Sequence, residues 1–188
     1  MQRRRDWWIK QYEHDIIRSK HHEPGRFPFV LVLDQLKASY NVAKILRSAN
    51  AMGAREVHLV RIGRFDPTPG KGALRHTRTV SYDDISASLR QLRDEGYAIY
   101  ALHVGGREVL GRATFPEKTA FILGHEEWGL SFNPADHPEV TTLRIPQFGI
   151  VQSLNVSIAA SLVGFEWLRQ HAPLEEAREI PPTDHHAP

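Results

Sequence analysis

The chain has 188 residues, with 24 Lys and Arg against 22 Asp and Glu, 11 His and no cysteine. This length is typical of one domain with short extensions, and a hydrophobic fraction of 41% with a charged fraction of 24% excludes disorder throughout. The lack of cysteine excludes a disulfide framework, a thiolate nucleophile and a sulfur-ligated metal. The amino terminus has no apolar core of a signal peptide, which predicts a cytoplasmic protein.

Residues 1–26 form a basic amino-terminal extension. They contain seven Lys or Arg residues and four acids, together with Trp7, Trp8 and Tyr12. Such a segment can bind a polyanion through phosphate pairing and base stacking. A solvated helix face with two aromatic side chains docked on the core explains the pattern equally well, so both interpretations stay open.

Apolar patterning predicts an α/β fold with a mostly parallel sheet flanked by helices. Five short apolar runs predict strands at residues 29–33, 56–60, 97–102, 119–123 and 141–145. Apolar residues at helical spacing predict three helices, at residues 42–52, 85–92 and 156–167. Asn41 is the expected N-cap of the first helix, and Gly53 is its expected stop.

Ligands of such sheets bind beyond the carboxyl ends of the strands. Three of these ends carry unusual polar side chains, in residues 34–47, 124–131 and 146–157. The third segment is rich in Gly, Ser and Asn, which leave the main chain approachable and supply short donors and acceptors, as an adenosine-like group requires. A loop followed by a Ser or Asn helix cap explains the same composition more simply.

Several common motifs are missing from the sequence. There is no G-x-G-x-x-G loop, no P-loop and no G-x-S-x-G elbow. His125 and Glu126 begin like H-E-x-x-H, but position 129 is Gly, so no metal site is predicted. The uncharged stretch from 145 to 165 holds too many polar groups for lipid, so no membrane span is predicted.

Three segments carry a specific resemblance when they are taken together. Residues 41–53 read NVAKILRSANAMG, residues 124–129 read GHEEWG, and residues 145–157 read IPQFGIVQSLNVS. They resemble N-x-G-x-I-x-R-T-A-x-A-F-G, G-x-E-x-x-G and I-P-M-x-G-x-x-x-S-L-N-V-S, the motifs of the SpoU/TrmH family in the SPOUT class of RNA methyltransferases. The resemblance covers about residues 29–170. The chain departs from the motifs at small loop or packing positions, namely Ala43, Ser48, Met52 and Gln147.

The resemblance implies a SPOUT-type fold with a carboxyl-terminal trefoil knot, a known exception to the rule against knots. It also implies S-adenosylmethionine as the cofactor, held largely by main-chain groups. By motif position, the residues that bind it are Leu102, Gly124, Ile145, Ser153 and Leu154. Members of the family form homodimers with the active site near the subunit boundary. The apolar closing helix, with Phe165, Trp167 and Leu168, is a candidate contact surface, and a purely intramolecular core role for it stays open.

The implied reaction is transfer of a methyl group to a ribose 2′-hydroxyl of RNA. The implied catalytic residues are Arg47, Asn41, Glu126, Ser153 and Asn155. The family usually assigns Arg47 as the base. Because a guanidinium stays protonated in proteins, we favour a role in binding the target phosphate and stabilising developing alkoxide charge. Glu126 would order the cofactor loop or fix Arg47. Asn41 would orient the substrate or the Arg47 loop, and the third-motif residues would line the pocket and shape the ribose site.

The substrate is expected to be tRNA rather than rRNA, because only about 28 residues precede the first predicted strand. In this division the methyltransferase domain spans residues 27–172, and residues 173–188 form an acidic tail that we expect to be flexible. The alternatives are an rRNA 2′-O-methyltransferase, a SPOUT enzyme that modifies a base, and a non-catalytic RNA-binding protein with the same fold. Further basic candidates for RNA contact are Arg64, Lys71, Arg75 and Arg78.

Overall fold

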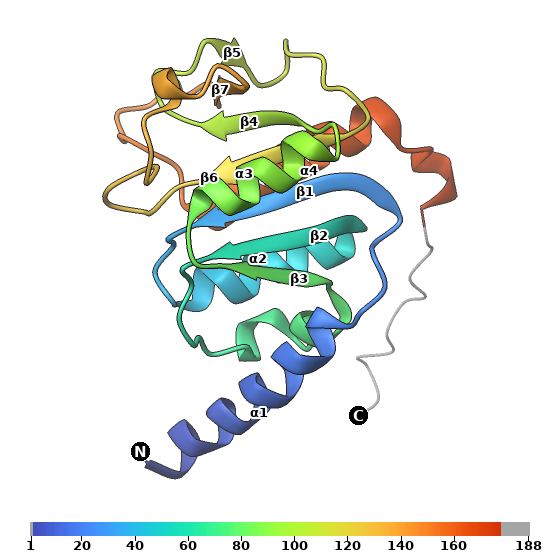
Figure 1. Cartoon of the computed structure of the whole chain (residues 1–188), viewed down its shortest axis with the longest axis vertical. Helices are drawn as coiled ribbons and strands as arrows, with labels where there is room; N and C mark the ends of the chain where they lie inside the picture. Colours follow the sequence, from blue (N-terminus) through green and yellow to red (C-terminus); the bar gives the residue numbers. More distant parts are fainter. Residues whose placement is uncertain (1, 178–188) are drawn as a thin grey trace, which may run out of the picture.

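The computed structural model describes residues 2–177, and within them seven parallel strands form one sheet with helices on both faces (Figure 1). The sheet order is β3-β2-β1-β6-β4-β7-β5. The strands are β1 (Phe27–Asp34), β2 (Ala54–Val60), β3 (Thr79–Tyr82), β4 (Ala98–Leu102), β5 (Glu108–Val109), β6 (Thr119–Leu123) and β7 (Val140–Arg144). The predicted α/β class with a parallel sheet is confirmed.

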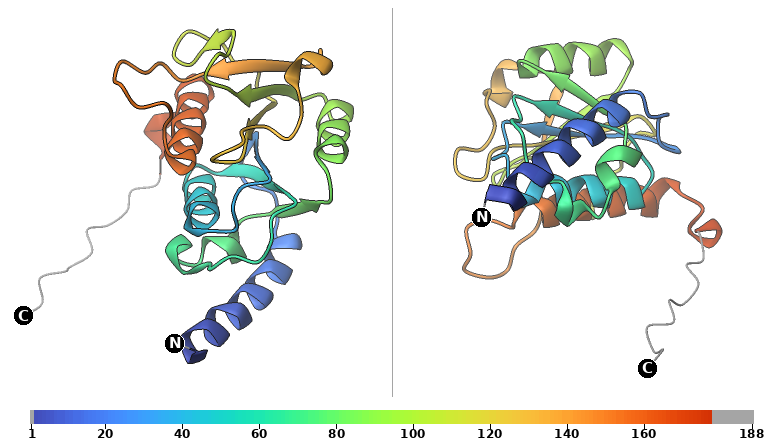
Figure 2. Two further views of the ribbon diagram at one scale, coloured as in Figure 1. Left: turned by 90° about the vertical axis from the view of Figure 1, so that its left-hand side faces the viewer. Right: turned by 90° about the horizontal axis from the view of Figure 1, so that it is seen from below.

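Two helices cover one face of the sheet and one helix covers the other (Figure 2). The four helices are α1 (Gln2–Lys20), α2 (Tyr40–Ala51), α3 (Ile85–Asp94) and α4 (Val156–His171). Alternate side chains of β1 divide between the two layers. Phe29, Leu31 and Leu33 pack with α2 and α4, whereas Val30 and Val32 pack with α3. The central strand is therefore apolar from Phe27 to Leu33, as a strand covered on both faces must be, and only its last residue, Asp34, is charged.

The five predicted strands are present. Two further strands at the edges of the sheet, β3 and β5, were not predicted because they have no apolar run. β3 has the sequence TVSY and β5 contains only two residues. They occupy the opposite edges of the sheet. An edge strand has one neighbour and is short and half exposed, so it needs no continuous apolar run to be stable.

The N-cap prediction for α2 was wrong. Ser39 is the N-cap, with extended backbone and a side chain that accepts from the main-chain N of Asn41. Asn41 is the second residue of the helix, and its side chain bonds to a distant loop instead. Gly53 follows the helix with φ of +66°, the left-handed conformation expected of a stop residue.

The helix α1 packs on the domain only through its second half, while its first half projects beyond the body (Figure 1). Tyr12 packs edge-on against Phe65 at 5.1 Å between ring centroids, and Asp15 and Ser19 are buried. Trp7 is 59% exposed, so it does not dock on the core. Arg64 pairs with Glu13 of this helix at 3.2 Å.

The acidic tail lies largely outside the described residues, from residue 178 onward. Its first part forms a short 3-10 turn, Leu174–Glu176, in which Glu176 accepts from Arg26 at 2.8 Å. Among residues 2–177, no helix combines the length and the apolar character that a membrane crossing needs.

Candidate active site

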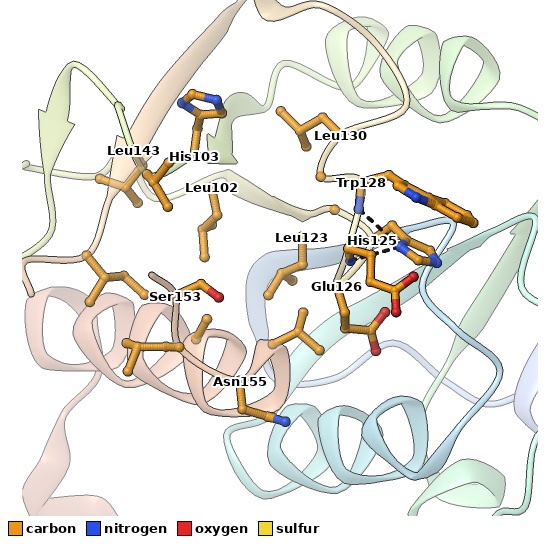
Figure 3. Close-up of a pocket in the computed structure, with 18 of the residues that line it drawn as sticks. Leu102, His103, Leu123, His125, Glu126, Trp128, Leu130, Leu143, Ser153 and Asn155 are labelled. Atoms are coloured by element: carbon orange, nitrogen blue, oxygen red, sulfur yellow. Dashed lines mark hydrogen bonds between the residues drawn. The ribbon is translucent and has the colours of Figure 1, made fainter. Parts of the chain in front are cut away.

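A pocket of about 530 Å³ opens at the carboxyl ends of β4, β6 and β7 (Figure 3). The chain places β2 and β3 on one side of β1, and β6, β4, β7 and β5 on the other. The pocket therefore lies beside the point where the strand order reverses, which is where parallel α/β sheets bind ligands. Its floor is apolar, with Leu102, Leu123 and Leu143 at the strand ends and Val156 at the start of α4.

The five residues predicted to bind the cofactor all line this one pocket. They are Leu102, Gly124, Ile145, Ser153 and Leu154. The volume and the apolar lining with a few polar groups are typical of a site for a small organic molecule. A Cβ atom at Gly124 would lie 2.5 Å from the carbonyl carbon of Gly129, so only glycine lets these two main-chain segments meet.

The turn after β6 is held firmly at both ends. His125 and Gly129 exchange two main-chain hydrogen bonds, of 2.7 and 2.9 Å. At the far end, the buried carboxylate of Asp34 accepts from the main-chain N and from Oγ of Ser131, both at 2.7 Å. Burial raises the pKa of Asp34, although the hydrogen bonds from Ser131 act in the opposite direction. The turn is thus fixed to the end of β1.

Side chains from all three motif segments meet in one hydrogen-bonded chain. Asn41 Nδ2 donates to Glu126 Oε1 at 3.0 Å, and Asn155 Nδ2 donates to Asn41 Oδ1 at 3.3 Å. The second oxygen of Glu126 accepts from the main-chain N of Lys37 at 3.1 Å. Burial acts against the ionised form of Glu126, but these hydrogen bonds outweigh it and hold the pKa below its ordinary value. The loops before α2 and α4 are therefore tied to the turn after β6.

Asn155 has two structural roles, and the first is the helix cap that the sequence offered. It is the N-cap of α4, since its Oδ1 accepts from the main-chain N of Ser157 at 2.9 Å. Its amide nitrogen remains free to reach Asn41, as described above. One side chain thus starts the helix and belongs to the polar chain.

Arg47 stands apart from the other predicted catalytic residues. Glu126, Ser153 and Asn155 line the pocket and Asn41 bonds to two of them, whereas Arg47 lies on the exposed face of α2, outside the lining. No acid among the described residues forms an ion pair with Arg47. Its charge is therefore presented to solvent. Within the described part of the chain, no group of three or more acids and histidines could hold a metal ion.

Comparison with known proteins identifies the family. The sequence profile of the SpoU rRNA Methylase family matches residues 28–165, which is most of the described chain. The chain belongs to this family. The resemblance noted in the three motifs is confirmed.

The SpoU relatives that match this chain include proteins named as tRNA and as rRNA methyltransferases. The chain is 31% identical over 146 residues to the tRNA (guanosine(18)-2′-O)-methyltransferase of Thermus thermophilus, covering 74% of each protein. It is also 31% identical over 151 residues to the 23S rRNA (guanosine-2′-O-)-methyltransferase RlmB of Neisseria meningitidis, covering 76% of this chain and 59% of that one. A solved structure concerned with 2′-OH methylation of C/U34 on tRNA matches with a TM-score of 0.66 and 29% identity, covering 76% of this chain and 95% of the other.

Three further residues lie at the site but were not among the predicted site residues. His103 follows β4 and lines the pocket, and Trp128 lies at its mouth. Lys37 bonds to Glu126 through its main chain and to Glu127 through its side chain. His103 could have been predicted, because it directly follows a strand and the carboxyl ends of parallel strands lie at the same edge of a sheet. Nothing in the local pattern marks Lys37, because its partners lie about 90 residues away in the sequence.

Proposed function

We propose that this chain transfers a methyl group from S-adenosylmethionine to a ribose 2′-hydroxyl of RNA, with tRNA as the favoured substrate. The observation that carries the proposal is the hydrogen-bonded chain of Asn41, Glu126 and Asn155. It joins the three SpoU motifs at the rim of one pocket. A protein that merely kept the fold would not need these three polar side chains in contact.

The pocket residues fit the cofactor. S-adenosylmethionine supplies an electrophilic methyl group on a sulfonium sulfur. The apolar floor suits a flat heterocycle, and the exposed main chain around Gly124, Ile145 and Leu154 supplies donors and acceptors for it. A side chain at position 124 would collide with the main chain of Gly129, so this part of the lining is built from closely packed main chain.

The residues outside the pocket would bind and orient the RNA. In-line transfer requires the hydroxyl and the methyl group to be aligned at near-contact distance, so orientation supplies much of the rate. Arg47 would bind the target phosphate and stabilise the charge that develops on the hydroxyl oxygen. Its exposure and its lack of an ion pair in the described residues support this role. Asn41 and Glu126 would fix the loops that carry these groups.

The matches include both RNA classes. Identity does not separate the two, since it is 31% for both relatives. Two of the three matches described above concern tRNA and one is the 23S rRNA relative, so tRNA is the favoured substrate. An rRNA 2′-O-methyltransferase remains the second candidate because of that relative.

The decisive experiment combines cofactor binding with methylation mapping. Calorimetry should detect S-adenosylmethionine and its demethylated product, each at about one site per chain. The purified protein and tritiated cofactor are then given tRNA or rRNA from cells that lack the gene. We expect one ribose-methylated nucleotide in the tRNA fraction. Label in rRNA alone would select the second candidate, a methylated base would exclude ribose chemistry, and cofactor binding without transfer to either RNA would indicate a non-catalytic protein.

We also infer a homodimer that forms through α4. Ile158, Leu162 and Phe165 follow each other at helical spacing on its exposed side, with Phe165 55% exposed. Phe148 and Ile150, in the loop before this helix, are fully exposed. Sedimentation should give a dimer for the wild type and a monomer for Phe165→Asp; a wild-type monomer would exclude the dimer. The trefoil knot and the cytoplasmic location implied earlier stay predictions.

A further inference from the structure

Trp128 is a large aromatic side chain that the fold leaves open to solvent. It lies at the mouth of the pocket, and 80% of its surface is exposed. An aromatic side chain buries about 150–250 Å² when it packs against other groups. At 80% exposure, Trp128 contributes little of the hydrophobic stabilisation that burial of this area would give. Trp167, in contrast, is 1% exposed and packs on Phe27 and Phe29. The exposure of Trp128 therefore needs an explanation.

The indole of Trp128 is held in a fixed orientation although it is exposed (Figure 3). Its ring is stacked on His125, with centroids 4.2 Å apart and planes inclined by 12°. His125 Nδ1 accepts from the main-chain N of Glu127 at 3.0 Å and of Trp128 at 3.3 Å. The turn is also closed by the paired main chains of His125 and Gly129. One indole face is thus covered by imidazole, and the other is available.

The surroundings of Trp128 favour a flat uncharged partner. Glu126 and Glu127 lie in the same turn. Glu127 pairs with the Lys37 ammonium, whereas Glu126 accepts from neutral groups, so a phosphate would meet the negative charge of Glu126 there. A nucleobase has a neutral π-face, and bases stack on exposed aromatic rings in a sequence-tolerant way. Glu126, two residues before Trp128, is bonded to Asn41. The open indole face therefore belongs to the same rim as the residues proposed to orient the RNA.

We infer that Trp128 binds the RNA substrate: the open face of its indole stacks on a base of the target nucleotide or of its direct neighbour. The stack fixes the base outside the pocket and so presents the attached ribose to the cofactor. This inference rests on the proposed function, since it assigns a binding role within that same reaction. Stacking of a base on this ring costs little conformational entropy, because His125 already holds the indole in place.

The test compares Trp128→Ala with Trp128→Phe in methyl transfer to unmodified total tRNA from cells that lack the gene. Loss of an aromatic stack should raise the KM for this RNA by roughly 5- to 150-fold in Trp128→Ala. Trp128→Phe keeps a stacking ring, so its KM should stay within about 5-fold of the wild type. Leu174→Ala, which shortens an exposed apolar side chain in the turn after α4, is the matched control and should leave KM unchanged.

A direct binding measurement complements the kinetics. The difference in fluorescence between the wild type and Trp128→Phe isolates the emission of Trp128 from that of Trp7, Trp8 and Trp167. Adding the same tRNA should quench this difference signal, since a stacked base quenches an indole. The titration needs no turnover, and it therefore reports on stacking even if methyl transfer is absent.

Each other outcome overturns the inference in a distinct way. An unchanged KM and no quenching would exclude stacking while methyl transfer by the wild type still supports the proposed function. Weaker cofactor binding of Trp128→Ala in calorimetry, with KM for RNA unchanged, would make Trp128 a cofactor contact. A shift of Trp128→Ala to a smaller species in sedimentation would make it a subunit contact. A wild type that neither transfers methyl groups nor binds tRNA would reject the proposed function itself.

Discussion

Two polar clusters in this protein have similar chemistry and very different surroundings. One is the chain of Asn41, Glu126 and Asn155 at the rim of the pocket, with contacts of 3.0 and 3.3 Å. The other is an interior cluster formed by Glu56 and His58 of β2 and Ser88 of α3. Ser88 Oγ lies 2.7 Å from His58 Nδ1, and His58 Nε2 lies 3.0 Å from Glu56 Oε1.

The interior cluster has the order of groups found in a hydrolase triad, yet it cannot meet a substrate. His58 and Ser88 are fully buried and Glu56 is 4% exposed. The ring of Tyr82 packs on His58 at 4.8 Å. Arg78 completes the cluster by donating to Glu56 at 2.9 Å, which engages one of the arginines first considered for RNA contact. Hydrogen-bond geometry alone therefore does not make a catalytic site, because the groups must also be accessible from a pocket.

The largest expected effect is that of Arg47→Ala, which should change methyl transfer but not stability. Arg47→Ala should lower methyl transfer by roughly 1000-fold, because it removes charge that stabilises the developing alkoxide. The melting temperature and the affinity for S-adenosylmethionine should stay at wild-type values, since Arg47 is exposed and outside the pocket lining. Lys44→Ala, at an exposed position of the same helix α2, is the matched control. A turnover of Arg47→Ala within 10-fold of that control would contradict the assignment.

The interior cluster should show the opposite behaviour. Glu56→Gln removes the charge that faces His58 and Arg78, which should cost about 3 kcal/mol of unfolding free energy. For a chain of this size the melting temperature should fall by roughly 6–12 °C. Methyl transfer per folded molecule should not change at a temperature where both proteins are folded. Calorimetric melting and the tRNA assay measure the two quantities.

The control for Glu56 is Glu117→Gln, which changes an exposed acid to the same amide. Its unfolding free energy should stay within about 0.5 kcal/mol of the wild type. If Glu56→Gln abolished methyl transfer while the protein stayed folded, the interior cluster would have a catalytic role in spite of its burial.

The rim cluster should give an intermediate effect that is shared between its members. Asn41→Ala and Glu126→Gln should each lower methyl transfer by roughly 10- to 100-fold by loosening the loops around the pocket. Because the two side chains bond to each other, the double variant should be less impaired than the product of the two effects, by about 1 kcal/mol of coupling. Fully additive effects would show that the contact does not matter for turnover.

The smallest expected effect is the contribution of Glu56 to the pH dependence of stability. Burial alone would raise the pKa of Glu56, but its contacts with His58 and Arg78 outweigh burial and hold that pKa below its ordinary value. The native state thus binds this proton more weakly than the unfolded state. The resulting stability is present above the unfolded pKa of about 4.3 and is lost as pH falls through the lower native pKa. The difference in melting temperature between the wild type and Glu56→Gln should therefore narrow below about pH 4. A difference that widens there would show that the pKa of Glu56 is raised, not lowered, in the native state.

Much of the fold and part of the site followed from local pattern. Continuous apolar runs predicted the central strands, since burial on both faces demands such residues, and helical spacing predicted α2, α3 and α4. The motif residues led to the correct family, and the structure brings Asn41, Glu126 and Asn155 into contact. The spacing of the motifs alone did not specify these contacts.

Tertiary structure decided the remaining features, because they depend on partners far away in the sequence. The edge strands β3 and β5 are defined by their neighbours and not by their own apolarity. Ser39 replaces Asn41 as the N-cap because the side chain of Asn41 is engaged 85 residues away by Glu126. His58 and Ser88 look like ordinary polar residues in the sequence, and only the packing of α3 on β2 buries them together. A sequence specifies which groups can form hydrogen bonds, whereas the packed chain determines which of them meet and which still face water.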